Sequence, residues 1–229
     1  ASPCSRVGTL RCRAPLLLGI AGLILLFWRF PLFHVVPLTQ ARERRQQVAF
    51  NPAEFAHAFW RYQLMQSLDR ATDAVEIVDA FARDPQAARQ RYGRTVGLSR
   101  TYYLFMSGRG WLVSVDSKGL SISLDQTGDE PEILLLTGLP FGNAIRDATG
   151  LLDASSFPNS QHFNDLSVEL NRIVETQVLP PIKREAAVGQ WIEFVGCVEV
   201  ANEARDLKPL RMLPIQAKLQ LAPAGRDPR

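Results

Sequence analysis

The sequence predicts an α+β protein in which a membrane anchor precedes a small helical layer and an antiparallel β-meander or barrel. Three observations support this class. Residues 14–28 are uniformly apolar, residues 51–93 repeat apolar side chains at helical spacing, and short strand-like runs separated by glycine follow residue 101. A further helical segment comes before the last two strands, so we expect a barrel with a helical insertion.

The composition of the 229-residue chain is typical of a globular protein, with 46% hydrophobic and 21% charged residues. The net charge is +3, and N-terminal arginines supply much of the excess, so a nucleic-acid partner is disfavoured. The three cysteines, Cys4, Cys12 and Cys197, form no close pair and give no disulfide framework. Cys197 lies in a strand-like run and is expected to be a buried small hydrophobe.

The apolar run determines the compartment in which the rest of the chain folds. Its flanking arginines are Arg6, Arg11, Arg13 and Arg29. A buried helix or a cleaved secretory signal has a similar length, but no Ala-x-Ala-like cleavage site follows. We predict an uncleaved signal anchor or transmembrane segment over residues 14–38, with residues 1–13 as a basic cytoplasmic segment. Residues 39–50 are then a basic linker, solvated or in contact with lipid headgroups.

Residues 51–93 predict three short helices that pack as one layer. Asn51 and Pro52 are a typical helix start, and we expect the first helix to continue to about Leu68. An aromatic stripe along this helix is more typical of a core than of a ligand site.

The second helix is expected over residues 71–82. Its predicted apolar face comprises Val75, Val78, Phe81 and Ala82. The third helix begins at Asp84-Pro85 and ends at Gly93, which we expect in the left-handed conformation.

Four strands of a meander are expected next: residues 101–106, 111–116, 120–124 and 133–137. Glycine-containing turns are expected between them: residues 107–110, 116–119 and 126–129. Because Gly108-Arg109-Gly110 would join two strands, it is not a dinucleotide-binding loop, which needs a following helix.

The helical insertion is predicted to begin with a short helix or turn over residues 142–150 and a loop over 155–161. A strongly amphipathic helix follows over about residues 162–179, and Pro180-Pro181 is expected to stop it.

Two last strands are predicted: residues 190–200 and 211–221. Gly196 is a candidate bulge. Residues 189–196 resemble a glycine-punctuated strand of an OB-like barrel, which is one candidate for the fold. The folded periplasmic domain is therefore predicted over residues 51–222, with a disordered tail over 223–229.

The sequence contains no pattern typical of a catalytic or metal site. His34, His57 and His162 share no ligand spacing with the cysteines or nearby carboxylates. A Gly-x-Ser-x-Gly elbow and a Cys–His pair are also absent. We expect no enzymatic activity, no metal and no cofactor.

Two groups of residues are candidates for binding. The first is an aromatic group that is either core or a base-stacking platform, with core favoured: Tyr102, Tyr103, Phe105 and Trp111, beside Arg100 and Arg109. The second combines amides with an Arg-Asp pair: Asn143, Arg146, Asp147, Asn159, Gln161 and Asn171, with Asn164 and Asp165 nearby. Such a group either lines a cleft for a sugar or another polar ligand, or holds irregular backbone in place, which is the favoured interpretation.

Several motifs resemble those of the DUF2291 family of bacterial envelope proteins, which are predicted periplasmic lipoproteins. The matching segments are Tyr92-Gly93-Arg94, residues 113–116, 142–148, 157–163, Leu170-Asn171, residues 189–196 and 213–215. Family members typically carry a lipidated cysteine just before a segment similar to Val36-Pro37. This chain has Phe33-His34 there, so a transmembrane anchor is expected as the substitute.

The resemblance implies an accessory role, because genes of such proteins often lie beside sugar-uptake ABC transporters. It implies no activity and no catalytic residue. We expect a non-enzymatic periplasmic protein, tethered to the inner membrane, that assists a transport system by binding a protein or polar ligand. The alternative is an OB-like module that binds single-stranded nucleic acid or oligosaccharide, and an undetected hydrolase is the least favoured. The sequence predicts no oligomeric state.

Overall fold

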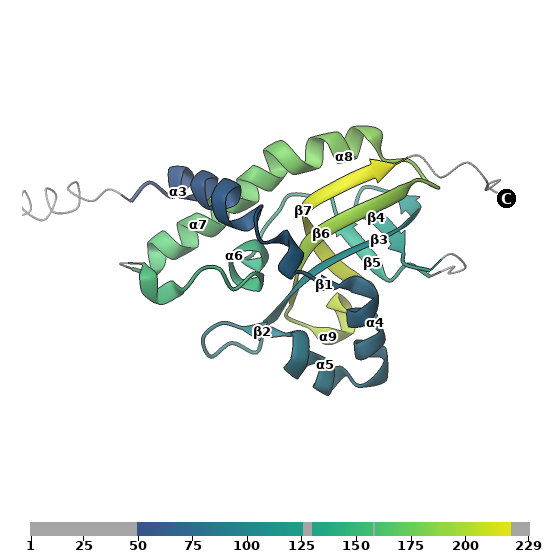
Figure 1. The fold of residues 1–229 in the computed structure, drawn as a ribbon, viewed down its shortest axis with the longest axis horizontal. Coiled ribbons are helices and arrows are strands. Elements are labelled where there is room, and N and C mark those ends of the chain that lie inside the picture. Colours follow the sequence, from purple (N-terminus) through teal and green to yellow (C-terminus); the bar gives the residue numbers. More distant parts are fainter. Residues whose placement is uncertain (1–49, 126–129, 158, 221–229) are drawn as a thin grey trace, which may run out of the picture. The chain divides into compact units, whose positions relative to one another are not determined.

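The computed structural model describes residues 50–125, 130–157 and 159–220 (Figure 1). The predicted anchor over residues 14–38, the turn at 126–129 and the tail over 223–229 lie outside these ranges and stay predictions. Within the described part of the chain, no helix has the length and apolar character needed to cross a membrane.

Five strands close into a barrel. They are β3 (Tyr102–Val115), β4 (Gly119–Ser123), β5 (Ile133–Leu136), β6 (Trp191–Val200) and β7 (Leu210–Gln220). Their order is β3-β4-β5-β7-β6, and β6 pairs with β3 to close the ring. Neighbours are antiparallel except β5 and β7, which are parallel. The predicted barrel with a helical insertion is therefore confirmed, although its β5–β7 pair is parallel where the sequence predicted an antiparallel sheet.

Strand β3 is one continuous strand where the sequence predicted two strands and a turn. Gly108 and Gly110 lie within it and pair with β6. A Cβ atom at Gly110 would collide with the carbonyl oxygen of Ser123, and one at Gly108 would collide with the ring of Phe194. These glycines permit close packing across the barrel rather than a reversal of the chain. The bulge predicted at Gly196 is confirmed by a shift in register between β6 and β7.

Alternate residues of β3 belong to two separate cores. Leu104 and Met106 pack in a cluster that includes side chains of the other barrel strands. Tyr103 instead packs with Cys197 and with side chains of the helical insertion. This period of two is what a strand with two covered faces requires.

The three N-terminal helices do not form one layer, which corrects the prediction. Helix α3 (Pro52–Phe59), extended by a π-helical turn η1 (Trp60–Leu64), packs on α7 (Ser160–Ile173). Helices α4 (Ala74–Arg83) and α5 (Pro85–Tyr92) instead pack on each other, and α4 contacts β3 (Figure 1). Between η1 and α4 the chain forms a short 3-10 turn, η2 (Leu68–Arg70), and a two-residue strand, β1 (Thr72–Asp73).

Local capping explains where these helices begin. Asn51 accepts a hydrogen bond from the backbone of Glu54, as predicted. Helix α4 starts later than predicted because Asp73 pairs with β3 and caps the helix, accepting from the backbone N–H of Val75 at 2.8 Å.

The predicted apolar face of α4 is shifted around the helix. Ala74, Ile77 and Phe81 are buried, whereas Val75 and Ala82 are exposed. Gly93 follows α5 with φ −79°, an extended conformation, so its predicted left-handed conformation is wrong. It is followed by the short strand β2 (Arg94–Thr95), which pairs with β3.

The helical insertion connects β5 to β6, and its elements are α6 (Ala144–Ala148), η3 (Ala154–Ser156), α7, η4 (Val174–Val178) and α8 (Leu179–Glu185). Pro180-Pro181 does not stop the helix. The π-helical turn η4 changes the hydrogen-bond pattern just before the prolines, which then occupy the first turn of α8, where their missing N–H groups are not needed.

Candidate ligand-binding site

A groove of about 630 Å³ lies between the loop that connects β5 to α6 and one side of α7 and η4. This volume is within the range of small-molecule sites, roughly 300–1,000 Å³. The loop contributes residues 140–143. The helical side contributes Asn164, Ser167, Val168, Asn171, Arg172 and Glu175.

The loop is held against the barrel and α7 by two hydrogen bonds. The side-chain amide of Asn171 donates to the backbone oxygen of Gly142 at 3.0 Å. The next backbone N–H, that of Asn143, donates to the Glu199 carboxylate of β6 at 3.1 Å. Gly142 has φ +84°, and a Cβ atom there would collide with the Glu199 carboxylate. Glycine is therefore required where the groove wall turns.

Behind the groove, Arg146 and Asp147 form a buried two-point ion pair. Arg146 Nε lies 2.7 Å from Asp147 Oδ1, and Nη2 lies 2.8 Å from Oδ2. The third nitrogen, Nη1, donates to the backbone oxygen of Phe163 at 3.0 Å and to Asn164 Oδ1 at 3.1 Å. The guanidinium also lies 3.8 Å from the centroid of the Phe163 ring. One side chain of α6 thus fixes the position of α7.

Ser167 is 6% exposed, and its hydroxyl has no hydrogen-bond partner in the described structure. In a helix, a serine hydroxyl usually bonds to the carbonyl four residues earlier, here that of Phe163. That oxygen already accepts the helical N–H of Ser167 and the Arg146 guanidinium, which occupy its two lone pairs. Ser167 is one of the residues that line the groove, but its hydroxyl oxygen is buried, out of contact with solvent, and unpaired.

Tyr103 lies beside the same polar residues. Burial is the largest cause that raises the pKa of its phenol to about 12, and the carboxylates of Glu199 and Asp147 raise it further. Arg146 and a hydrogen bond with Asn143 act in the opposite direction on this pKa. The phenol is therefore protonated near neutral pH.

Two of the six predicted site residues have local roles at the start of α7. Asn159 accepts a hydrogen bond from the backbone of His162 at 2.9 Å and caps the helix. Gln161 donates to Asp165 at 2.7 Å on the exposed surface. Neither lines the groove, whereas the other four predicted residues lie on it or directly behind it.

Sequence reasoning missed Phe141, Ser167 and Glu199. Ser167 carried a signal, because it lies three residues after Asn164 and four before Asn171, on the same face of one helix. Glu199 carried none, since its contact with the loop joins positions 56 residues apart in the sequence.

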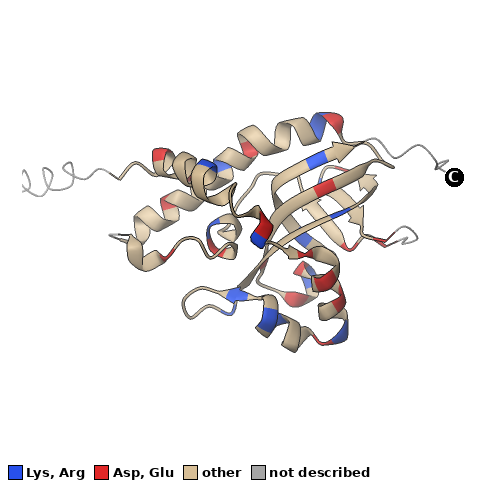
Figure 2. Ribbon diagram, in the orientation of Figure 1, with Lys and Arg blue, Asp and Glu red and all other residues tan. Residues whose placement is uncertain are grey.

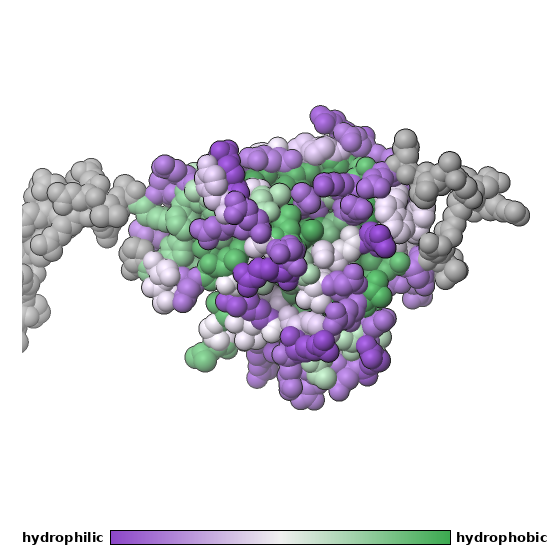
Figure 3. Space-filling view, viewed as in Figure 1, coloured by the Kyte–Doolittle hydropathy of each residue, from purple (hydrophilic) through white to green (hydrophobic). Residues whose placement is uncertain are grey.

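A second hollow of about 270 Å³ adjoins the N-terminal end of α3 and is lined largely by apolar side chains. Phe50 stacks on His162, with ring centroids 4.8 Å apart, and contacts Phe157 edge-on. Apolar surface is visible around α3 in Figure 3. This aromatic cluster packs the beginning of the folded domain against α7, and Asp153 and Ser156 are the polar residues that line the hollow.

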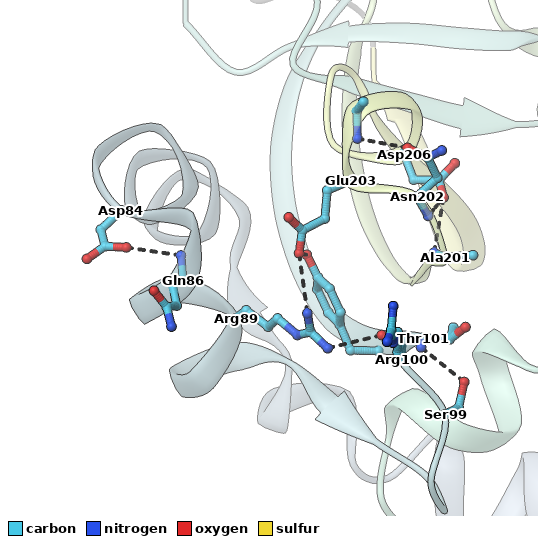
Figure 4. Close-up of polar contacts among 12 residues, drawn as sticks. Asp84, Gln86, Arg89, Ser99, Arg100, Thr101, Ala201, Asn202, Glu203 and Asp206 are labelled. Atoms are coloured by element: carbon cyan, nitrogen blue, oxygen red, sulfur yellow. Dashed lines mark hydrogen bonds and ion pairs between the residues drawn. The ribbon is translucent and has the colours of Figure 1, made fainter.

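Another polar cluster connects α5, β3 and α9 (Glu203–Asp206), as Figure 4 shows. The Tyr102 hydroxyl donates to Glu203 at 3.2 Å, and Arg89 lies 3.7 Å from the same carboxylate. The Arg89 guanidinium also covers the Tyr102 ring, 4.8 Å from its centroid. Burial, followed by the charge of Glu203, raises the pKa of Tyr102. We interpret this cluster as a structural link between segments distant in the sequence.

The four aromatic residues of β3 that were considered as a stacking platform differ in burial. Tyr102 and Tyr103 are buried, which confirms the core interpretation for them. Trp111 packs edge-on against Trp191 of β6, with centroids 4.8 Å apart.

The remaining candidates are side chains that could hold a metal ion, and Cys197. Across the described ranges, no three His, Cys, Asp or Glu side chains are placed to hold a metal ion. Cys197 is buried, as predicted, and burial raises the pKa of its thiol.

The barrel and its helical insertion define the chain as an OB-fold protein. It resembles the crystal structure of an OB-fold protein from Thermotoga maritima, with a TM-score of 0.67 and 25% sequence identity, covering 75% of this chain and 99% of that one. Residues 23–218 match DUF2291, described as a predicted periplasmic lipoprotein, and the chain belongs to this family. No curated protein matches the sequence.

Family membership confirms the predicted resemblance and identifies an envelope-associated protein. A lipoprotein is anchored by lipid rather than by an apolar span, so the family description differs from the transmembrane anchor predicted for residues 14–38. Those residues lie outside the described ranges.

Proposed function

We propose that the protein is a non-enzymatic accessory protein, tethered to the inner membrane, whose periplasmic domain assists a solute transport system by binding a polar ligand or a protein. The observation that carries this proposal is the groove beside α7. Its walls are fixed by the Arg146–Asp147 pair and by the Asn171–Gly142 hydrogen bond, so its shape exists before any ligand arrives. A preformed polar groove is suited to binding.

The chemistry of the groove also supports a binding role. Its serine hydroxyl has no neighbouring base among the described contacts, and a weak nucleophile needs one. Beside it, Leu139 and Phe141 are large apolar side chains that are 77% and 83% exposed on the same loop. Exposed apolar groups at the rim of a groove are typical of a surface that a partner covers.

The decisive experiment is affinity capture of the tagged full chain from detergent-solubilised membranes, followed by mass spectrometry. We expect a component of a membrane transport system to be recovered. Phe141→Asp alters the rim without changing the core, and it should weaken the capture. Leu98→Asp, which changes an exposed apolar residue elsewhere, is the matched control and should not. Repeated captures that contain no transport component or other envelope partner would overturn the proposal.

The alternative nucleic-acid function has less support. Two of its proposed stacking residues are in the core. Acidic and basic residues are interspersed along the ribbon in Figure 2. Single-stranded nucleic acid is bound by a continuous basic surface with exposed aromatic rings. A titration with single-stranded DNA at low salt tests this alternative, and we expect no binding.

A further inference from the structure

We propose that the loop between β2 and β3, residues 96–101, docks on a bilayer that contains anionic phospholipids, with Leu98 entering the apolar region. This inference goes beyond the proposed function, because it concerns how the folded domain lies on the membrane and not what the groove binds. The β2–β3 loop shares no residue with the groove, so the two proposals can fail independently.

Leu98 is the most exposed of the large apolar side chains in the described part of the chain. It is fully exposed, whereas Phe141 and Leu139 are 83% and 77% exposed. It follows Gly97, which has φ +65° and open space on its Cβ side. Figure 1 shows the loop projecting from the fold beyond β2. A leucine at the tip of a projecting loop gains most from entering an apolar phase, because no part of the fold covers it.

The charges on this part of the chain match anionic lipid. Residues 85–115 contain no acidic residue, and their arginines are Arg89, Arg91, Arg94, Arg100 and Arg109. Arg94 and Arg100 flank the loop and are exposed, and within the described ranges neither forms an ion pair. Guanidinium groups bind phosphate well, and basic residues near a membrane surface attract anionic lipid. An apolar tip between two arginines is therefore suited to the boundary between headgroups and acyl chains.

The base of the loop is held to the fold, so Leu98 is presented at a defined place. Arg89 of α5 donates to the backbone oxygen of Arg100 at 3.1 Å (Figure 4). The Ser99 hydroxyl accepts a backbone N–H two residues later at 3.0 Å. Val96 packs against the core cluster formed by side chains of α3, α6 and α7. The loop thus uses one apolar residue for its own packing and leaves the other exposed.

The β2–β3 loop and the start of the described chain contact one common segment, residues 150–153. Arg94 lies against this segment, because a Cβ atom at Gly150 would come within 2.7 Å of its guanidinium. Residues 151–153 line the hollow that also contains Phe50, the first described residue. The base of the loop is therefore close to the point where the chain enters the fold.

The predicted anchor ends at residue 38, so residues 39–49 separate it from the fold. Such a segment spans at most about 40 Å. A domain held this close to a bilayer meets its surface at a high effective concentration, and a contact made by one leucine and two arginines is then sufficient.

The test places a fluorescent label on the loop of the full chain, which is reconstituted in vesicles whose acyl chains carry a nitroxide quencher. Cys4 and Cys12 are first replaced by serine, and Cys197 is buried, so the label reacts with the introduced cysteine. Ser99→Cys labels the loop, and Ser117→Cys labels the exposed turn between β3 and β4 as the matched control. In an equal mixture of phosphatidylglycerol and phosphatidylcholine, we expect the lipid to quench the first label and not the second.

Further substitutions in the chain labelled through Ser99→Cys separate the two parts of the contact. Leu98→Asp should lower the ratio of docked to undocked loops more than about tenfold, because the buried leucine is lost. Leu139→Asp, on an exposed loop elsewhere, should not change it. Arg100→Gln should lower the ratio about fivefold, the effect of one basic residue near an anionic surface. Arg109→Gln, more than about 20 Å farther along β3, should have no effect.

Several outcomes would overturn the proposal. One is quenching of the loop label that does not exceed quenching of the control label, and another is quenching that Leu98→Asp leaves unchanged. Equal quenching in vesicles of phosphatidylcholine alone would refute the assignment to anionic lipid. Shielding of the loop label that requires added envelope proteins would assign the loop to a protein partner instead.

The results do not depend on the transport role. Capture of a transport component is carried out in detergent, where no bilayer is present, so Leu98→Asp stays a valid control in that experiment. A captured component without quenching of the loop label would refute the membrane contact alone. Quenching without a captured component would refute the transport role alone.

Discussion

Two Arg-Asp neighbours, Arg146–Asp147 and Arg205–Asp206, form the same ion pair in opposite surroundings. The Nε–Oδ1 distances are 2.7 and 2.8 Å, and both aspartate side chains are almost fully buried. The arginines differ, because the Arg146 side chain is 6% exposed and that of Arg205 is 66% exposed.

The partners of the aspartates also differ. Both hydrogen bonds of the Asp147 carboxylate come from Arg146, whereas Asp206 also accepts the backbone N–H groups of Ala201 and Asn202. Two ion pairs of nearly equal length are therefore expected to contribute unequally to stability. The free energy of unfolding that is lost when the arginine is removed depends on how buried the pair is and on whether the aspartate has other hydrogen-bond donors.

The largest effect is expected for Arg146→Met. Removing this guanidinium leaves a buried carboxylate without a partner, and we expect the free energy of unfolding to fall by about 3–5 kcal/mol. Urea unfolding of the full chain measures it. The double variant Arg146→Met/Asp147→Leu should recover much of the loss because it removes the unpaired charge as well. A loss below about 1 kcal/mol in the single variant would contradict this account.

An intermediate effect is expected for Asp206→Ala, which leaves two backbone donors of Ala201 and Asn202 without their acceptor. We expect a loss of about 1–3 kcal/mol. The effect should depend on pH. Burial alone would raise the pKa of Asp206, but the hydrogen bonds from Arg205, Asn202 and Ala201 outweigh burial and lower it.

Because the pKa of Asp206 is lower in the folded state, the unfolded state binds more protons in the acidic range. The stabilisation is fully present above the unfolded pKa, about 4, and is lost as the pH falls through the folded value. The stability difference between wild type and Asp206→Ala should shrink on acidification. A constant difference from pH 6 to pH 2.5 would show that the charge of Asp206 is irrelevant.

The smallest effect is expected for Arg205→Ala. Its guanidinium is solvated, and Asp206 keeps its backbone donors, so the loss should be about 0.5 kcal/mol or less. Thermal unfolding at low and high salt measures it. If Arg205→Ala costs as much as Arg146→Met, exposure does not explain the difference between the pairs.

Predictions from local sequence were the most accurate. Asn51 and Asp84 were predicted to begin helices, and their side chains accept hydrogen bonds from backbone N–H groups two or three residues away, so the information is contained in one short window. The last two strands and the bulge at Gly196 were predicted for the same reason. Gly108 and Gly110 led to the wrong prediction of a turn, because glycine permits both a turn and a close approach of two strands. Which of the two occurs depends on strands that are distant in the sequence.

The candidate site, too, could be predicted only as far as local sequence determines it. Asn143 and Asn171 were predicted and line the groove, and Arg146 and Asp147 were predicted to pair. The unpaired state of Ser167 could not be predicted, because it depends on Arg146 reaching a carbonyl of another helix. The chemistry of the groove is set by tertiary packing rather than by any motif.

The packing of α3 on α7 has a mechanical consequence. A pulling force applied to the chain before residue 50 would act on α3 first. Helix α3 is held on α7 by the packing of their side chains. A force that separates two packed helices breaks contacts one after another, whereas strands sheared in a barrel must break many hydrogen bonds together. Such a force would therefore act first on α7, which forms one wall of the groove, while the barrel stays intact.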